Sequence, residues 1–386
     1  MKAVEITKGV YWVGAIDWSV RNFHGYTTNR GATYNAYLII DEKITLIDTV
    51  KAPFAHELLE RVRSVVDPEK IDYVVSNHVE MDHSGALPEI MQYCKNATVV
   101  TSSPAGMKGL MAHYGEHKYK AVSANETLNL GSRNLVFVPT PMVHWPDNMV
   151  TYCPEEKILF SNDAFGQHYA SSGRFDDEED LNIILEEARK YYANIVMPYS
   201  RQASGAIDIA AGLDISIIAS SHGVIWRSHV KEIMDAYKEW TKCEAKEKAI
   251  VVFDSMWHST ETIAQTITEA LKEKGVQVKF FDLKQNHMSD ILTEVLDTKY
   301  IIVGSPTLNN NMMPTVAGFL CYLKGLIPKG RKGFAFGSYG WGGQSIGQVE
   351  EILKAAGCEI CLPMIRLQYI PTKEELDKVR EDILAM

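Results

Sequence analysis

The sequence predicts an α/β protein with two domains, and three observations support this. The first two-thirds of the chain mixes hairpin signatures with amphipathic segments, a mixture typical of sheets covered by helices. Residues 238–248, KEWTKCEAKEK, are charged and have little to bury, which indicates a domain boundary. Beyond them strands and helices alternate regularly, which predicts a small doubly wound parallel sheet. The expected domains are residues 1–247 and 248–386.

Composition and charge narrow the possible functions. The chain has 386 residues, more than one core usually supports, and its net charge of -10 disfavours general nucleic-acid binding. No apolar stretch approaches the roughly 20 residues needed to cross a bilayer, so we expect a soluble protein without membrane contact. The six cysteines are widely spaced, and the opening MKAVEITKGVYWVG has no apolar signal segment. We therefore expect a cytoplasmic protein with reduced thiols.

The first domain is expected to contain two hairpins. Residues 34–40 and 44–48 are apolar strands joined by three charged residues, and residues 149–153 and 157–160 form the second pair. Further strands are expected at 9–16, 71–75, 98–101 and 135–138, and amphipathic segments at 54–66 and 105–113.

The second domain is expected to have five strands with helices between them. The strands are predicted at 249–253, 276–283, 300–306, 333–339 and 359–364, and the helices at 260–273, 291–296, 315–323 and 345–356. Cys358 and Cys361 form a CxxC pair within the last strand. A rubredoxin-type iron or structural zinc site needs a second such pair, so core packing is the expected role.

A cluster of potential metal ligands follows the apolar run 71–75. His78, Glu80, Asp82 and His83 lie within six residues, where a loop leaving a strand can turn them toward one centre. The further candidates are His144, Asp163 and His222. One tetrahedral zinc would leave three of the seven ligands unused, so two metals fit better. Four imidazoles and three carboxylates form a hard, anionic set, which favours iron or manganese.

A second site is expected where three strands of the second domain end. Hydroxyls and free amides at the start of the helix after the first strand form an anion site, although simple capping by Ser259 or Thr260 would use the same residues. The loops GSPTLNNNMMP and GSYGWGG add hydrogen-bonding groups and aromatic faces. The GxGxxG fingerprint is absent, which favours FMN over NAD or FAD. The candidate residues are Ser255, Met256, Trp257, His258, Ser259, Thr260, Pro306, Thr307, Leu308, Asn309, Ser338, Tyr339, Gly340, Trp341 and Gly342.

These motifs resemble those of one family, the flavodiiron proteins or A-type flavoproteins. HVEMDH, PMVHWPDN, NDAFGQH and SSHG are similar to its diiron site, and DSMWHST, GSPTLNN and GSYGWGG to its FMN loops. The resemblance covers essentially the entire chain. It implies a metallo-β-lactamase-like αββα sandwich domain followed by a flavodoxin-like doubly wound parallel-sheet domain.

The resemblance also assigns the ligands. It implies that His78, Glu80 and His144 hold one iron, that Asp82, His83 and His222 hold the other, and that Asp163 bridges them. In zinc hydrolases of the wider fold the position of Glu80 is usually a histidine. Glu80 therefore differs from the zinc hydrolases in a way that favours iron.

The function implied by the resemblance is reduction of dioxygen to water, of nitric oxide to nitrous oxide, or both. Electrons would pass through FMN from rubredoxin or a reduced deazaflavin, expected as a separate donor because no rubredoxin segment follows Met386. The family places one subunit's FMN beside the other's irons in a head-to-tail homodimer, possibly a dimer of dimers. Candidate proton donors are His24, Tyr26 and His168. Trp145 and Phe165, beside ligands, are expected to wall off the metals.

Two other interpretations fit part of the sequence. A zinc-dependent hydrolase of the metallo-β-lactamase fold with a flavodoxin-like docking domain explains the ligand spacing, but it explains neither Glu80 nor the flavin pocket. A flavin-based electron carrier with a vestigial metal domain predicts broken ligands, whereas all seven are present.

Overall fold

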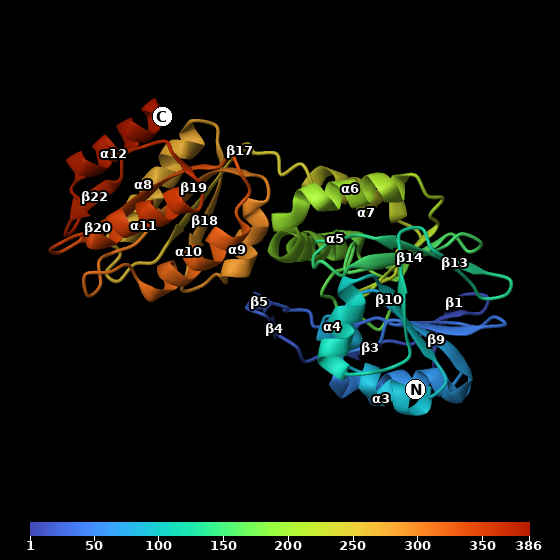
Figure 1. Cartoon of the computed structure of the whole chain (residues 1–386). Coiled ribbons are helices and arrows are strands. Elements are labelled where there is room, and N and C mark those ends of the chain that lie inside the picture. Colours follow the sequence, from blue (N-terminus) through green and yellow to red (C-terminus); the bar gives the residue numbers. More distant parts are fainter. The chain divides into compact units, whose positions relative to one another are not determined.

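The chain folds into two compact units. The computed structural model describes residues 1–386 (Figure 1). Unit 1 comprises Met1–His24, Thr28–Tyr191 and Tyr199–Thr241, and unit 2 comprises Gly25–Thr27, Tyr192–Pro198 and Lys242–Met386. No helix of the structure combines the length and the apolar character needed to span a membrane.

Unit 1 is built on two sheets. The seven-stranded sheet has the order β1-β2-β7-β8-β9-β10-β11, and the five-stranded sheet has the order β12-β13-β14-β15-β16. The strands of the first are β1 (Val4–Thr7), β2 (Val10–Trp12), β7 (Tyr37–Ile39), β8 (Ile44–Ile47), β9 (Ile71–Ser76), β10 (Thr98–Ser102) and β11 (Tyr119–Val122). Those of the second are β12 (Thr127–Asn129), β13 (Asn134–Pro139), β14 (Met149–Cys153), β15 (Ile158–Asn162) and β16 (Ile217–Ser220). Three short strands complete the unit: β3 (Ala15–Asp17), β4 (Asn22–Phe23) and β6 (Ala32–Tyr34), whereas β5 (Tyr26–Thr27) belongs to unit 2.

The two sheets pack face to face, and helices cover their outer faces. Buried residues of both sheets, such as Tyr37 and Val75 from one and Phe137 and Phe160 from the other, form one core. A second core joins the outer face of the first sheet to helices α1, α3 and α4. Figure 1 shows α5, α6 and α7 on the opposite side of the sheets. The helices are α1 (Ala55–Arg63), α2 (Met81–Ser84), α3 (Leu87–Tyr93), α4 (Ala105–Tyr114), α5 (Leu181–Tyr191), α6 (Ser200–Ala211) and α7 (Val230–Trp240).

Both expected hairpins are confirmed, since β7 pairs antiparallel with β8 and β14 with β15. The single strands predicted at 9–16 and 34–40 are wrong, because each breaks in two. At the break Gly14 packs so closely on the backbone at Tyr34 and Asn35 that any side chain there would collide with it. Asn35 in turn donates its backbone N–H to Ser221 instead of to a sheet. The breaks thus bring the segment that carries β6 against the loop that follows β16.

Unit 2 is a doubly wound parallel sheet, as predicted. Its order β18-β17-β19-β20-β21 places the second strand outside the first, and every pairing is parallel. The strands are β17 (Lys246–Phe253), β18 (Gln277–Asp282), β19 (Thr298–Gly304), β20 (Lys332–Tyr339), β21 (Glu359–Ile360) and β22 (Ile365–Gln368). The helices are α8 (Ser259–Glu273), α9 (Met288–Val295), α10 (Pro314–Leu326), α11 (Gln344–Ala355) and α12 (Lys373–Ala385).

The fifth strand of unit 2 differs from its prediction. Residues 359–364 do not form one strand, because β21 stops at Ile360 and β22 resumes pairing with β20 at Ile365. Pro363 lies in the gap, and proline has no N–H to donate to a ladder. Cys358, next to β21, is a buried free thiol, which agrees with a packing role.

Candidate metal centre and flavin pocket

The loop after β9 is held so that its ligands point one way. Asn77 donates its backbone N–H and its side-chain amide to the buried carboxylate of Asp48, at 2.7 and 2.9 Å. The chain then passes His78 and Glu80 before helix α2 turns Asp82 and His83 to the same side. A buried strand end and one helical turn thus present four ligand-type side chains from six consecutive residues.

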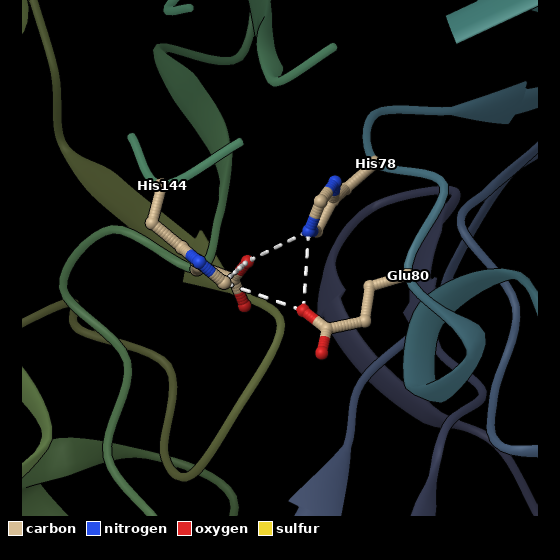
Figure 2. Close-up of side chains that lie close together, drawn as sticks. His78, Glu80 and His144 are labelled. Atoms are coloured by element: carbon tan, nitrogen blue, oxygen red, sulfur yellow. Dashed lines mark hydrogen bonds and ion pairs between the residues drawn. The ribbon is translucent and has the colours of Figure 1, made fainter. Parts of the chain in front are cut away.

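The other three candidates leave strand ends of the second sheet. His144 lies on the loop after β13, Asp163 directly follows β15, and His222 follows β16. Figure 2 shows His78 and His144 approaching Glu80 from separate segments, and each histidine Nε2 lies 3.3 Å from Glu80 Oε2. The structure therefore brings all seven sequence-predicted ligands together.

The seven side chains form two groups. In each group one ligand atom per residue lies within 4.8 Å of the others, and the groups are His78, Glu80, His144 and Asp163, and Asp82, His83 and His222. Asp163 faces both. Its Oδ2 lies 3.7 Å from His78 Nε2 and 3.5 Å from His144 Nε2, while its Oδ1 lies 3.0 Å from His83 Nε2 and 3.5 Å from His222 Nε2. Its carboxylate thus connects the two groups.

Hydrogen bonds behind the histidines fix which nitrogen faces the centre. His78 donates through Nδ1 to Asp147 Oδ2 at 2.8 Å, and His222 donates through Nδ1 to the Thr33 carbonyl at 2.6 Å. Because both acceptors lack a proton, Nε2 of each ring is left as the ligand atom. Neither residue was among those predicted from the sequence. Asp147 could have been found three positions after His144, whereas Thr33 acts through its backbone and leaves no signal.

The electrostatics of this cluster fit cations. Asp82 Oδ1 is buried without a hydrogen-bond partner, an arrangement that costs free energy unless a positive charge satisfies it. Burial lowers the pKa of His78, but hydrogen bonds to Asp147 and Glu80 outweigh it and raise the pKa to about 10. Burial also lowers the pKa of His144, but hydrogen bonds to Asp163 and Glu80 outweigh it and raise the pKa to about 10. The carboxylates thus attract positive charge, which two metal ions would supply.

The three candidate proton donors lie in different surroundings. His24 is exposed, and its Nε2 lies 3.4 Å from Glu80 Oε1. The buried ring of His168 packs on those of Tyr191 and His222, and burial, followed by the charge of His222, lowers the pKa of His168 well below its usual value. Tyr26 is buried and belongs to unit 2. Among the three, His24 therefore combines solvent access with contact to a ligand.

An open pocket of about 700 Å³ leads to the ligands, and His24, Lys51, Glu80 and His144 line it. Trp145 forms part of its wall and packs against the rings of His78 and His144. Phe165 instead packs on Tyr237 from α7. Of the two aromatic residues expected to wall off the metals, the structure shows Trp145 against ligands and Phe165 against α7.

The flavin candidates of unit 2 occupy three loops at the carboxyl ends of β17, β19 and β20. In this strand order the first and third strands are neighbours whose crossovers diverge, which opens a crevice for a ligand. The Thr260 hydroxyl at the start of α8 lies 2.8 Å from that of Ser338 near the end of β20. The buried hydroxyl of Ser255 has no hydrogen-bond partner. These hydroxyls, with the free amides of the helix start, fit a phosphate.

The remaining flavin candidates lie at the same three strand ends. Trp257 and Trp341 are 87% and 80% exposed, an unusual state for large apolar side chains. They fit a planar ring that covers apolar surface. Met256, His258, Asn309 and Gly342 are also exposed, Ser259, Thr307, Leu308, Tyr339 and Gly340 are half-buried, and Pro306 is buried.

Comparison with known proteins agrees with these two sites. A family model described as ODP family beta lactamase matches residues 32–223, and one described as flavodoxin matches residues 251–382. The chain is 46% identical to the nitric oxide reductase of Moorella thermoacetica over 98% of this chain and 96% of that protein. It is 43% identical to the rubredoxin-oxygen oxidoreductase of Megalodesulfovibrio gigas, again over 98% and 96%. The crystal structure of the flavodiiron protein from Giardia intestinalis superposes with a TM-score of 0.95 and 37% identity, over 100% and 96% of the two chains.

Proposed function

The chain belongs to the flavodiiron protein family, and we propose that it reduces dioxygen to water, nitric oxide to nitrous oxide, or both, at two irons fed with electrons by FMN. The observation that carries this proposal is the pair of ligand groups connected by Asp163. A zinc hydrolase explains neither Glu80 among the ligands nor a flavodoxin domain with a flavin site, so that alternative is not retained.

In this proposal His78, Glu80 and His144 hold one iron, Asp82, His83 and His222 hold the other, and Asp163 bridges them. When bound, the irons supply electrons and open coordination positions for the gas. Asp147 and the Thr33 carbonyl keep the rings of His78 and His222 oriented. Trp145 shields the ligand edges from water. One rigid cluster would hold both metals close together, which suits either two nitric oxide molecules, which need two electrons, or one dioxygen, which needs two further electrons from reduced FMN.

Unit 2 is proposed to hold FMN in the crevice between its first and third strands. Ser255, Ser259 and Thr260 would bind the phosphate at the start of α8. Tyr339 and Trp341 would stack on the flavin ring, while the loop from Pro306 to Asn309 supplies hydrogen bonds to its polar edge.

Proton supply is assigned to His24. Its side chain is 74% exposed and therefore exchanges protons with solvent, yet it reaches Glu80 at the rim of the metal cluster. His168 is held neutral by burial and suits a role as packing partner of His222 better than as acid. Tyr26, in unit 2, remains a candidate proton donor.

As electron donor we propose a rubredoxin-type protein, because the M. gigas relative is named rubredoxin-oxygen oxidoreductase. A reduced deazaflavin is the other candidate donor. A head-to-tail homodimer, possibly paired again, would bring one subunit's FMN to the open pocket of the other. The free cysteines support a reducing compartment, the cytoplasm. Activity per subunit that stays constant on dilution to a demonstrated monomer would contradict the dimer.

The test of the function is metal and flavin analysis followed by reaction with gas. We expect two irons and one FMN per chain, and rapid reoxidation of the anaerobically reduced protein by dioxygen, nitric oxide or both. Rates measured separately with each gas would show which is preferred. Zinc alone, with hydrolytic turnover and no reoxidation, would overturn the proposal.

Replacing Asp147 with alanine should weaken iron binding by about 10- to 100-fold, because His78 loses the acceptor that fixes its tautomer and ring orientation. Competition with an iron chelator measures the change. Asp147→Asn keeps an acceptor oxygen and should recover part of the affinity. Asp176→Ala is the control, since Asp176 is also buried but bonds the backbone at 227–229. Equal effects of the two alanine variants would contradict a specific role.

Iron binding to protein stripped of metal should strengthen as the pH rises. The pKa values of His78 and His144 are raised to about 10, and the charges of Asp82 and Asp163 outweigh burial and raise that of His83 to about 9. Each ring is therefore protonated at neutral pH, and the metal must displace that proton. Affinity should rise about tenfold per pH unit for each proton displaced. Chelator competition and direct measurement of proton release check this, and an affinity independent of pH between about 6 and 8 would contradict it.

The same raised pKa values predict that the stability of the metal-free protein falls as the pH rises, whereas its iron affinity increases. A raised pKa in the fold means that the charged imidazoles stabilise it fully below the ordinary value of 6.5, and that this stabilisation is lost as the pH rises through about 9 to 10. Urea unfolding of stripped protein across this range should therefore show stability falling while iron affinity rises.

A further inference from the structure

A narrow apolar pocket lies on the outer face of the second sheet of unit 1. The space in it that the centre of a water-sized molecule can occupy is about 30 Å³, enough for a very small ligand. Val138, Val150 and Leu159, from three adjacent strands, form its floor, while α6 and α7 form the opposite wall. Successive residues of a strand point to opposite faces, so the neighbours Phe137, Met149 and Phe160 fill the core between the sheets.

The pocket has a cause in the sequence of α6. The residues of this helix that line it include Ala203, Ala206, Ile207 and Ala210, spaced as one helical face. Three of these four side chains are single methyl groups. By contrast, α1 fills the core beneath it with Leu58, Leu59 and Val62. The alanine face is too short to fill the space against the strands.

The inner wall of the pocket is the backbone that carries two metal ligands. Val143 precedes His144, and Ala164 and Phe165 follow Asp163, and all three line the pocket. Phe165 has a φ of +67°, a conformation that costs free energy for a bulky residue. Two contacts hold it there: Trp226 Nε1 donates to its carbonyl oxygen at 2.9 Å, and its ring packs on Tyr237 with centroids 4.6 Å apart. This held conformation keeps the Phe165 ring turned toward α7.

We propose that this pocket holds the diatomic gas substrate beside the metal centre and passes it to the irons by a path separate from the open pocket. Dioxygen and nitric oxide are small and weakly polar, and they lose no hydrogen bonds on entering an apolar cavity. Dry apolar cavities of proteins take up xenon and comparable ligands. The open pocket is unsuited to this task, because His24, Lys51, Glu80 and Asp82 keep it hydrated.

This inference rests on the proposed function, and the proposed assembly strengthens it. If the flavin of a second subunit covers the open pocket, gas needs another way to the irons. A store one residue away from His144 and Asp163 would raise the local gas concentration, and it would lower the concentration of gas at which the enzyme is half-saturated.

The experiment uses the iron- and FMN-loaded protein, xenon as probe and one matched pair of variants. Ala210→Leu fills the pocket, and Ala211→Leu adds the same side chain at the exposed neighbouring position of α6. We expect xenon, in pressurised crystals, to occupy the pocket of the unchanged protein and of Ala211→Leu, and to be absent from Ala210→Leu. The KM for gas should rise several-fold in Ala210→Leu alone, with kcat unchanged at saturation. The half-buried Ala206→Leu serves as the filling variant if Ala210→Leu does not fold.

The outcomes separate the pocket from the function. No xenon in the unchanged protein, or an unchanged KM in a filled variant that has lost xenon, would overturn the gas pocket and leave gas reduction intact. Xenon in the pocket of a protein that carries iron and FMN but reduces neither gas would overturn the proposed function, and the gas assignment with it.

Discussion

Asp163→Asn should empty both iron sites while leaving FMN in place. The two oxygens of Asp163 face different ligand groups, so its loss reaches all four ligand histidines. The variant keeps the size of the side chain but removes one of three carboxylates from a buried cluster, and it points an N–H group at one metal. Losing an outer partner of a ligand costs 10- to 100-fold, so losing the shared ligand should cost about 100-fold or more in gas-reduction rate. Iron and FMN analysis of the same sample measures both effects.

Asp82→Asn provides the graded comparison. Asp82 Oδ2 lies 3.1 Å from His222 Nε2 and 3.4 Å from His83 Nε2, both in one group. This variant should lose one iron and retain the other, whereas Asp163→Asn loses both. If Asp163→Asn still bound two irons per chain with near-normal turnover, Asp163 would not be the shared ligand.

The sequence predicts the grouping of these side chains most strongly where the signal is local. Four ligand-type residues within six positions after an apolar strand form a pattern that chance seldom produces, and Glu80 within it indicated iron over zinc. The convergence of His144, Asp163 and His222 is set by which strands pair. For these three the resemblance of the motifs, not the periodicity, carried the prediction. Thr33 could not be predicted, because it contributes a backbone carbonyl, which every residue has.

The sequence predicts the strands of the sheets, but it does not predict where a strand breaks in two. Apolar runs indicate strands, and hairpin turns indicate which neighbours pair. Whether a run breaks depends on distant backbone, as at Gly14, where the chain crosses close to Tyr34. The alanine face of α6 illustrates the same limit. Its spacing is visible in the sequence, but the empty space it leaves depends on the strands it meets.

Ser259→Asp should remove FMN and leave both irons bound. Ser259 is the first residue of α8, where unpaired backbone N–H groups and the positive end of the helix dipole favour an anion. An aspartate at this position stabilises the helix, so the variant is expected to fold. Its carboxylate nevertheless stands where the FMN phosphate would bind, and placing like charges together costs several kcal/mol. Affinity for FMN should therefore fall by about 100-fold or more.

Ser259→Asn separates charge from shape, because asparagine has the size of aspartate and also caps helices but carries no charge. Fluorescence titration of flavin-free protein with FMN should give near-normal affinity for Ser259→Asn and a large loss for Ser259→Asp. Riboflavin, which lacks the phosphate, should bind both variants equally, and iron content should match that of the unchanged protein. Normal FMN affinity in Ser259→Asp would show that the phosphate does not bind at the start of α8, and it would not affect the diiron assignment. Together with Asp163→Asn, which loses iron and keeps FMN, the pair tests whether two separate units hold the two cofactors.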